Sequence, residues 1–274
     1  MPTTIRDTDY DILRYCHELR FCTIDHLAAL TGRQRQALNL RLNQLIAEKY
    51  IHRYRFPNPN HKHIYSIGSQ GYRHLAFHGA IRLEDVPARL RTAELKPLFL
   101  DHTLLVTDIH VTLILASRNS PKRLVEWREG KELYESVTFF ANSKKKRLPV
   151  CPDAFFQIEE NGRRLAYALE ADRGTTTRRT FEDKINAYWR FLDQNRQVKA
   201  YAVKWFRVIT VTLTRARADG LAESASDLLP EKYKKYFLFT SHVGLSHITQ
   251  NCGPSEKHPT QVKKSFDNFP FYMV

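Results

Sequence analysis

Cysteine is scarce in this chain, and the few cysteines show no pairing pattern. The four residues, Cys16, Cys22, Cys151 and Cys252, form no Cys-x-x-Cys unit. Cys16, Cys22 and His26 could be imagined as zinc ligands, but no fourth ligand follows at zinc-finger spacing. We therefore expect reduced, structural thiols.

Long apolar runs are also missing. No stretch of about eighteen consecutive apolar residues is present, and the polar start at residues 6–11 is unlike a signal peptide. No internal repeat or low-complexity tract is visible. We expect a soluble, cytoplasmic protein with no membrane partner.

Basic residues are abundant instead. The 274 residues include 43 Lys/Arg against 29 Asp/Glu, a formal net charge of +14, and the pI is about 9.7. This balance is expected of a protein that meets a polyphosphate, although charge alone does not distinguish DNA, RNA and other acidic polymers. At this length, with 42% hydrophobic residues, we expect two domains.

Residues 152–188 contain the strongest chemical signal. Two short apolar runs flank Asn161-Gly162, which is a strong hairpin turn signal, so residues 155–159 and 164–172 should lie antiparallel. The carboxylates of this segment would then gather at one end of the hairpin.

Asp153 would lie near the end of the first strand, beside Glu170 and Asp172 on the second. Side chains two apart on a strand point to one face, so Glu170 and Asp172 should point together. Such a cluster suits Mg²⁺ or Mn²⁺ and a phosphodiester substrate. Like-charge repulsion favours a metal over the alternative, in which the acids only pair with nearby cations. Those cations are Arg163, Arg164, Arg173 and Lys184.

Residues 1–80 predict three helices and a hairpin. A helix begins near Asp7, Thr23 caps a second that ends at Thr31-Gly32, and a third follows at once. Two helices around a tight turn of this kind are typical of a helix-turn-helix. The outward residues of the third helix are predicted to be Arg33, Gln36, Leu40 and Asn43.

The predicted hairpin, residues 51–56 and 61–67 around a Pro/Asn turn, makes this region resemble a winged helix. The third helix would enter a major groove of DNA while Arg53, Arg55 and Lys62 contact phosphates. Winged helices can also bind proteins or form dimers. DNA is favoured because the region contains 11 Lys/Arg against 6 Asp/Glu, with seven histidines added.

Four segments follow from these patterns. We assign residues 1–80 to a winged-helix domain, 81–97 to a connector, 98–243 to a second domain and 244–274 to a C-terminal tail. The tail, which has an aromatic end, either docks on the body of the protein or mediates self-association, for example as a homodimer.

The second domain is predicted to be α/β, a mixed sheet flanked by helices. Lys184 and Tyr188 lie four apart on one helix and share a face. The basic run Lys144, Lys145, Lys146 and Arg147 is either a solvated loop or a phosphate contact. The helices and strands are predicted at residues 98–117, 124–129, 155–159, 164–172, 180–193, 201–203, 206–213, 215–229 and 236–240.

This order, with Pro-Asp at 152–153 and Glu-x-Asp at 170–172, resembles the PD-(D/E)xK nuclease superfamily, also called restriction-endonuclease-like. That motif normally ends in lysine, where Asp172 stands here. Some members carry the lysine on the following helix with a tyrosine four residues on, as Lys184 and Tyr188 do. The resemblance implies that Asp153 and Glu170 bind Mg²⁺ or Mn²⁺. It also implies that Asp172 adds a ligand or orients water and that Lys184 steadies water or phosphate.

A narrower resemblance spans nearly the whole chain up to about residue 240. The motifs His-Thr-Leu-Leu-Val at His102, Pro-Asp-Ala, Leu-Glu-Ala-Asp-Arg-Gly-Thr and Lys-Ile-Asn-Ala-Tyr together resemble the replication-relaxation family of plasmids and other mobile elements. That resemblance implies a DNA-nicking role on double-stranded DNA. It also makes His102, otherwise a core histidine on an apolar helix face, a candidate catalytic group.

Three hypotheses follow. The first is a metal-dependent DNA endonuclease or nickase positioned by a winged helix. The second is a DNA-binding regulator or replication initiator whose nuclease-like domain is inactive, which Asp172 in the lysine position permits. The third is a relaxase with a tyrosine nucleophile, tested at Tyr188.

Overall fold

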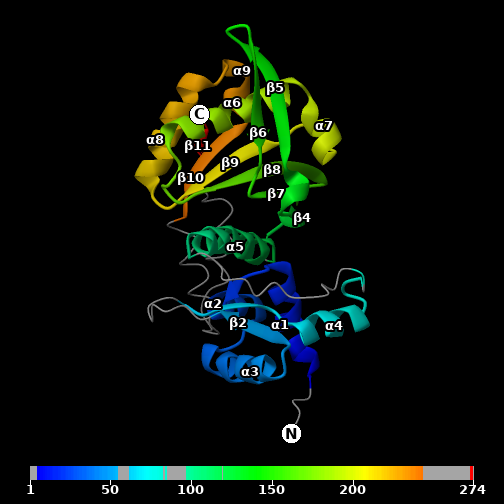
Figure 1. Ribbon diagram of the computed structural model, residues 1–274. Helices are drawn as coiled ribbons and strands as arrows, with labels where there is room; N and C mark the ends of the chain where they lie inside the picture. Colours follow the sequence, from blue (N-terminus) through cyan, green and yellow to red (C-terminus); the bar gives the residue numbers. More distant parts are fainter. Residues whose placement is uncertain are drawn as a thin grey trace. The chain divides into compact units, whose positions relative to one another are not determined.

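The computed structural model describes residues 5–54, 62–82, 84, 97–118, 120–242 and 272–273. These residues form a mixed α/β protein with two compact units, divided between Leu115 and Ala116 (Figure 1). The α/β fold class is therefore confirmed. The division falls inside a helix that the sequence analysis gave to the second domain.

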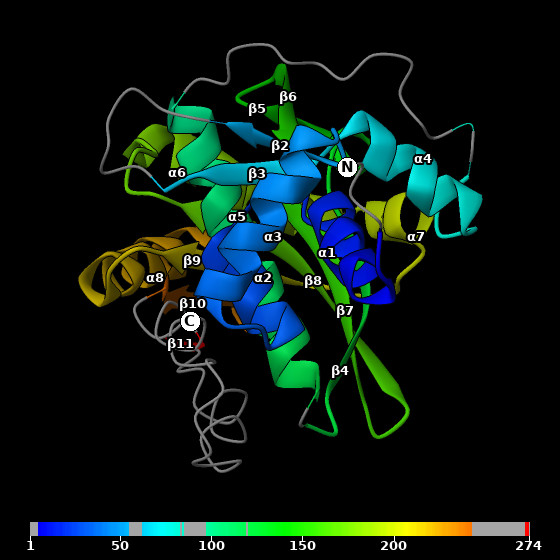
Figure 2. The same ribbon diagram turned by 90° about the horizontal axis from the view of Figure 1, so that it is seen from below.

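The first unit combines helices with a small antiparallel sheet. The sheet order is β1-β3-β2, and α2 lies beside both α1 and α3 (Figure 2). The observed helices and strands, whose bounds follow, confirm the predicted helices and hairpin. The winged-helix assignment stays a prediction. The elements are α1 (Asp7–Glu18), β1 (Cys22–Thr23), α2 (Ile24–Thr31), α3 (Arg35–Ala47), β2 (Ile51–Tyr54), β3 (Ile64–Ile67), α4 (Ser69–Phe77) and α5 (Pro97–Arg118) up to Leu115.

Local sequence signals fix the ends of these helices. The Thr23 hydroxyl accepts a hydrogen bond from the His26 amide and so caps α2, as predicted. Gly32 ends α2 with a φ of 70°, a left-handed conformation that glycine adopts without strain. A Cβ at Gly68 would lie 2.2 Å from the Lys49 carbonyl oxygen, so only glycine allows the chain to start α4 this close to residue 49.

Helix α5 is tied to the first unit by polar and apolar contacts. The Thr107 hydroxyl donates to the Phe21 carbonyl across 3.0 Å. Nε2 of His26 lies 2.6 Å from Oδ1 of Asp108. Val111 is buried in the same core as the helices α1 to α3. These contacts explain why α5 up to Leu115 groups with the N-terminal elements.

The same helix has the composition of a membrane span. Phe99–Arg118 is long and apolar enough to cross a bilayer, and 61% of that stretch is buried within the structure. A core helix of a folded domain passes the same test. The expected absence of a membrane partner stays a prediction.

The second unit is built on a six-stranded sheet with the order β11-β10-β9-β8-β7-β4. Strands β8, β9 and β10 are parallel to one another, and the remaining pairs are antiparallel. Its strands are β4 (Arg123–Arg128), β7 (Ala154–Glu160), β8 (Arg163–Asp172), β9 (Arg207–Thr212), β10 (Phe237–Ser241) and β11 (Tyr272–Met273). Its helices are α6 (Arg178–Asp193), α7 (Arg196–Tyr201), α8 (Arg215–Leu228), α9 (Glu231–Lys234) and a 3-10 turn at Lys131–Leu133.

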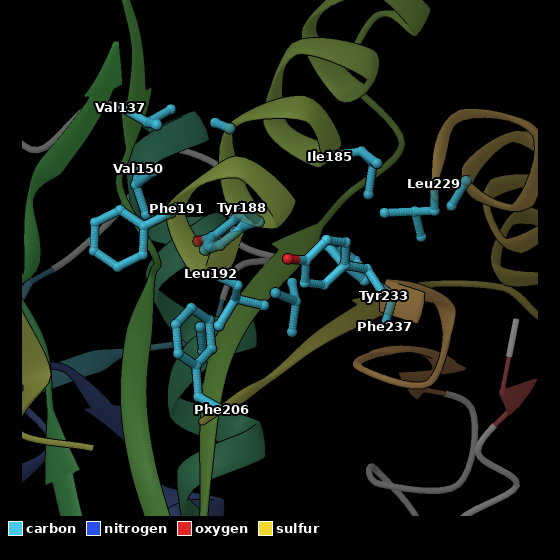
Figure 3. Close-up of a cluster of buried hydrophobic side chains, with 14 of the residues drawn as sticks. Val137, Val150, Ile185, Tyr188, Phe191, Leu192, Phe206, Leu229, Tyr233 and Phe237 are labelled. Carbon is cyan, nitrogen blue, oxygen red and sulfur yellow. The ribbon is translucent and has the colours of Figure 1, made fainter. Parts of the chain in front are cut away.

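The core of the second unit lies between the sheet and helices α6 and α8. Tyr188, Phe191 and Leu192 of α6 pack against Phe206 and Phe237 from the sheet side (Figure 3). All five side chains are buried. Each of these side chains removes a large apolar area from water on folding, so this core stabilises the unit.

A second hairpin, β5 (Glu135–Ala141) with β6 (Lys144–Val150), was missed by the sequence analysis. Its turn places Asn142 and Ser143 at positive φ. The four basic residues from Lys144 to Arg147 therefore lie on strand β6, so the loop alternative was wrong, and the phosphate contact stays a prediction. A strand is normally recognised from alternating apolar and polar residues. These four side chains are all charged and exposed, so the sequence shows no such alternation here.

The predicted strand at residues 201–203 was also wrong. The structure has helix α7 there, ending at Tyr201, with Ala202 in the left-handed region at φ 55°. Short apolar runs do not distinguish a buried helix end from a strand. The predicted tail, which lies largely outside the described residues, contributes β11, which pairs with β10.

Candidate active site

The β7–β8 hairpin brings Asp153 and Glu170 together. Asn161 and Gly162 form its turn at φ values of 51° and 75°, and Ala154 pairs with Leu169. The register therefore places Asp153 opposite Glu170. The Ala171 amide donates to Oδ2 of Asp153 across 2.8 Å, which fixes that carboxylate. The predicted hairpin and the placement of its acids at one end are confirmed.

Glu170 is buried, with 6% of its surface exposed, and both of its oxygens have donors. The Tyr188 hydroxyl donates to Oε1 across 2.5 Å, and Nζ of Lys184 donates to Oε2. Burial raises the pKa of Glu170, and the neighbouring Asp153 adds to that effect while Lys184 opposes it. A cation near this carboxylate would lower the cost of its burial.

Lys184 and Tyr188 both reach Glu170, as expected of residues four apart on one helix face. Burial works against the charge of Lys184, but Glu170 beside it leaves the lysine pKa raised. Burial, followed by the charge of Glu170, raises the Tyr188 pKa well above its ordinary value. At neutral pH Lys184 is therefore a cation, and Tyr188 is a neutral hydrogen-bond donor.

Asp172 has a cationic partner of its own. Nε of Arg217 donates to Oδ2 across 2.8 Å, and the Gly174 amide donates to Oδ1 across 3.2 Å. Burial would raise the Asp172 pKa, but the hydrogen bonds from Arg217, Thr176 and Gly174 and the charge of Arg217 together outweigh it and leave that pKa lowered. Asp172 shares the pocket with Glu170, and its described contacts are those of an ion pair.

Arg217 was missed by the sequence analysis, although one signal was present. It lies in the first turn of α8, capped by Thr214, where the helix dipole disfavours a cation. A basic residue in that position indicates a carboxylate partner nearby. The partner is 45 residues away in sequence, so spacing alone does not identify it.

A small pocket of about 20 Å³ lies on the Glu170 side of the site, and Asp153 is not among its lining residues. Its lining includes Glu170, Asp172, Lys184 and Tyr188, and its size suits a single water or small ion. No group of three or more His, Cys, Asp or Glu side chains arranged for a metal occurs in the part of the chain that the structure describes. Asp153 and Glu170 remain a two-carboxylate donor set of the kind that Mg²⁺ accepts when water and phosphate complete its shell.

The predicted DNA contacts of the first unit fall into two groups. Gln36 and Asn43 are exposed on α3, whereas Arg33 precedes α3, is half-buried and donates to the Thr8 carbonyl across 2.7 Å. Leu38 faces inward as expected. The outer face of α3 is therefore accessible, and Arg33 is partly used within the fold.

The predicted wing residues make contacts with neighbouring elements. Nη1 of Arg53 donates to Oδ1 of Asn43 across 2.9 Å, and Nζ of Lys62 lies 2.8 Å from Oδ2 of Asp25. Arg55 lies outside the described residues. Exposed pairs of this kind are weak, so phosphates can compete for these cations.

The remaining candidates lie away from this pocket or in the other unit. Lys144, Lys145, Lys146 and Arg147 are exposed on β6, and Nε of Arg147 donates to the Ser136 hydroxyl across 2.9 Å. His102 is half-buried on α5, in the first unit. The carboxylate pocket is formed within the second unit alone.

These features define a two-unit α/β protein with a buried carboxylate and lysine pair at the end of a central strand. The family described as Replication-relaxation matches residues 13–205, and the chain belongs to that family. Membership indicates a role in the replication or relaxation of plasmid or other mobile-element DNA, with DNA as the general partner. No curated protein and no solved structure matched the chain.

Proposed function

We propose that the protein is a DNA-binding, metal-dependent endonuclease or nickase. The observation that carries the proposal is the Asp153, Glu170 and Lys184 arrangement at one end of the β7–β8 hairpin. Two fixed carboxylates beside a lysine match the parts that phosphodiester hydrolysis needs. Mg²⁺ or Mn²⁺ is the proposed cofactor.

Asp153 and Glu170 would hold the metal, which would supply Lewis acidity toward the phosphate. The carboxylate of Asp153 is held by the Ala171 amide, and that of Glu170 is held by the Tyr188 hydroxyl. Lys184 would orient the attacking water or the scissile phosphate through Nζ. Arg217 would keep Asp172 ionised and in place.

The first unit would supply the DNA affinity. Its helices and hairpin fit a winged helix, with α3 as the element that enters the major groove. Gln36 and Asn43 would then reach base edges while Arg53, Arg55 and Lys62 contact phosphates. Lys144, Lys145, Lys146 and Arg147 would bind phosphates on the second unit.

The second candidate is a DNA-binding regulator or replication initiator with a degenerate nuclease fold. One observation favours it: Glu170 pairs with Lys184 and Asp172 pairs with Arg217, so most of the acidic charge is already balanced. Asp172 also occupies the position where the motif normally has lysine. A tyrosine-dependent relaxase is less well supported, because the Tyr188 hydroxyl is buried and bound to Glu170.

The deciding experiment mixes supercoiled plasmid with the full chain and Mg²⁺ or Mn²⁺. Nicked or relaxed plasmid that EDTA prevents is expected, and Asp153→Asn and Glu170→Gln should each abolish turnover while leaving DNA binding intact. The matched control is Glu159→Gln, a half-buried acid near the turn end of the same hairpin, where it pairs with Arg164. Plasmid that is bound yet unchanged with both metals would favour the regulator.

A further inference from the structure

A groove of about 810 Å³ lies in the second unit, away from the carboxylate pocket. Arg164 and Ala166, from the start of β8, line it, whereas Glu170 and Asp172 lie at the other end of that strand. At about 3.3 Å per residue, Ala166 and Glu170 are about 13 Å apart along β8. The volume is within the range of roughly 300–1,000 Å³ found for ligand clefts.

The groove is strongly basic. A single carboxylate, Glu126, lines it, and it pairs with Arg128 across 2.7 Å. No ion pair of Lys199, Lys204 or Arg207 occurs among the described residues, so these three exposed cations have their charge available for an anion. Five cations line the groove, namely Arg128, Arg164, Lys199, Lys204 and Arg207.

An aromatic pair forms part of the same wall. The rings of Trp205 and Tyr236 are stacked, with centroids 5.2 Å apart and an interplanar angle of 14°. Trp205 nevertheless remains 41% exposed, although a large apolar ring in water is unfavourable. An exposed tryptophan among unpaired cations offers a planar ligand a stacking surface.

The wall that holds Trp205 is fixed in place. Gln197 is fully buried, and its Nε2 donates to the Lys204 carbonyl across 2.9 Å. The Tyr201 hydroxyl donates to the Leu133 carbonyl across 2.8 Å. The chain after α7 is therefore anchored at Tyr201 and again at Lys204. The groove wall that these residues form is preformed.

We propose that this groove binds a single-stranded segment of nucleic acid, with a base on Trp205 and phosphates on Lys199, Lys204 and Arg207. A single strand is required because the base faces of a duplex are already stacked on one another. The proposal rests on the proposed function only in taking nucleic acid as the partner. In a protein that nicks DNA or initiates replication, the groove would bind a strand that has been separated from its complement.

The test uses the full chain in EDTA and a fluorescent oligothymidylate of about twelve nucleotides, with binding measured by anisotropy. Trp205→Ala should weaken binding about 5- to 150-fold, the range for loss of one base–aromatic stack, and Trp205→Phe should lose less. Phe140→Ala, which removes an exposed aromatic ring from β5 outside the groove, should change nothing.

The salt dependence tests the phosphate contacts. Neutralising Lys199, Lys204 and Arg207 together to Gln should lower the slope of log K against log salt by about 2, at about 0.7 per contact on a single strand. The charge-matched control neutralises three exposed cations of the same unit outside the groove lining. They are Lys131, Arg196 and Lys232.

Three outcomes would overturn the proposal. These are unchanged oligonucleotide affinity in Trp205→Ala, an equal loss of duplex affinity in that variant, and displacement of the oligonucleotide by poly-glutamate at equal concentration. A parallel series with oligouridylate distinguishes RNA from DNA as the source of the strand. Asp153→Asn should bind oligothymidylate with the affinity of the wild type. Loss of plasmid nicking and loss of oligonucleotide binding are therefore independent results.

Discussion

The Tyr188 hydroxyl donates a hydrogen bond to Oε1 of Glu170 across 2.5 Å, and the tyrosine ring is buried in the core. A phenol in this position orients the carboxylate of Glu170 and shares its small pocket. Its raised pKa keeps it protonated at neutral pH. Tyr188 is therefore the residue at which our hydrolysis proposal and a covalent relaxase mechanism can be told apart by experiment.

Tyr188→Phe should lower the free energy of unfolding by about 1.5–3 kcal/mol, because Glu170 loses a hydrogen bond to a charged group. Plasmid products should keep free ends in both proteins. The measurements are urea unfolding and a gel in denaturant for protein bound to DNA. A protein–DNA adduct in the wild type that disappears in Tyr188→Phe would establish the tyrosine as nucleophile.

Asp172→Asn should lower the free energy of unfolding by about 1–3 kcal/mol at pH 7, because Arg217 loses its charged partner. The folded-state pKa of Asp172 is lowered, so its contribution is present above the ordinary carboxyl pKa and is lost as the pH falls through the folded value. The difference between wild type and variant should therefore shrink below about pH 4. Urea unfolding across pH measures this effect.

Asp219→Asn is the matched control, because Asp219 pairs with Arg215 at 3.9 Å on an exposed face of α8. Its effect should stay below about 0.5 kcal/mol at every pH. If Asp219→Asn lowered the free energy of unfolding as much as Asp172→Asn does, burial of the Asp172–Arg217 pair would be unimportant.

Asp172→Lys should impair Mn²⁺ binding, since a new cation would stand beside Arg217 and Lys184. Titration of Mn²⁺ followed by its paramagnetic signal measures affinity without any need for turnover. Stronger binding or faster nicking in this variant would instead show that the natural site has lost a lysine it requires.

Asp9→Ala should lower the free energy of unfolding by about 3–5 kcal/mol, because the buried Arg41 would lose the carboxylate that balances its charge. Asp9 is fully buried, and Nε of Arg41 donates to its Oδ1 across 2.9 Å. Thermal unfolding gives the measurement. Asp11→Ala, at an exposed acid 3.6 Å from Arg14, is the control and should be near neutral.

Changing Arg53, Arg55 and Lys62 together to Ala should weaken binding to all duplex sequences. At about 0.9 per phosphate contact, the salt slope should fall by up to about 3. Asn43 loses its Arg53 partner but stays exposed, so the fold should survive. Equal affinities of variant and wild type across a salt titration would indicate that this hairpin contacts protein.

The hairpin around Asn161-Gly162 and the meeting of Asp153 with Glu170 could be predicted because turn chemistry and strand periodicity are local. The shared helix face of Lys184 and Tyr188 followed from helical spacing in the same way, whereas their common contact with Glu170 was not predicted. The Arg217 partner of Asp172 could not be predicted, since it depends on how α8 packs beside the strand ends.

Strands β5 and β6 were missed for a different reason. Residues 144–147 are all exposed, so no apolar alternation marks them as a strand. The groove at Trp205 was hidden as well, because its wall depends on the chain leaving α7 at Ala202 with positive φ. Tertiary packing, rather than local preference, decides these features.

Strand β8 has a consequence for hydrogen exchange. Its residues 167–169 pair with β7 on one side and β9 on the other, and most of the strand is buried. Amides in such a position exchange only when the whole unit opens. Glu170 and Asp172 thus lie on the strand whose backbone amides we expect to exchange most slowly in the unit. Local fraying near the loop after α7 should leave their spacing unchanged.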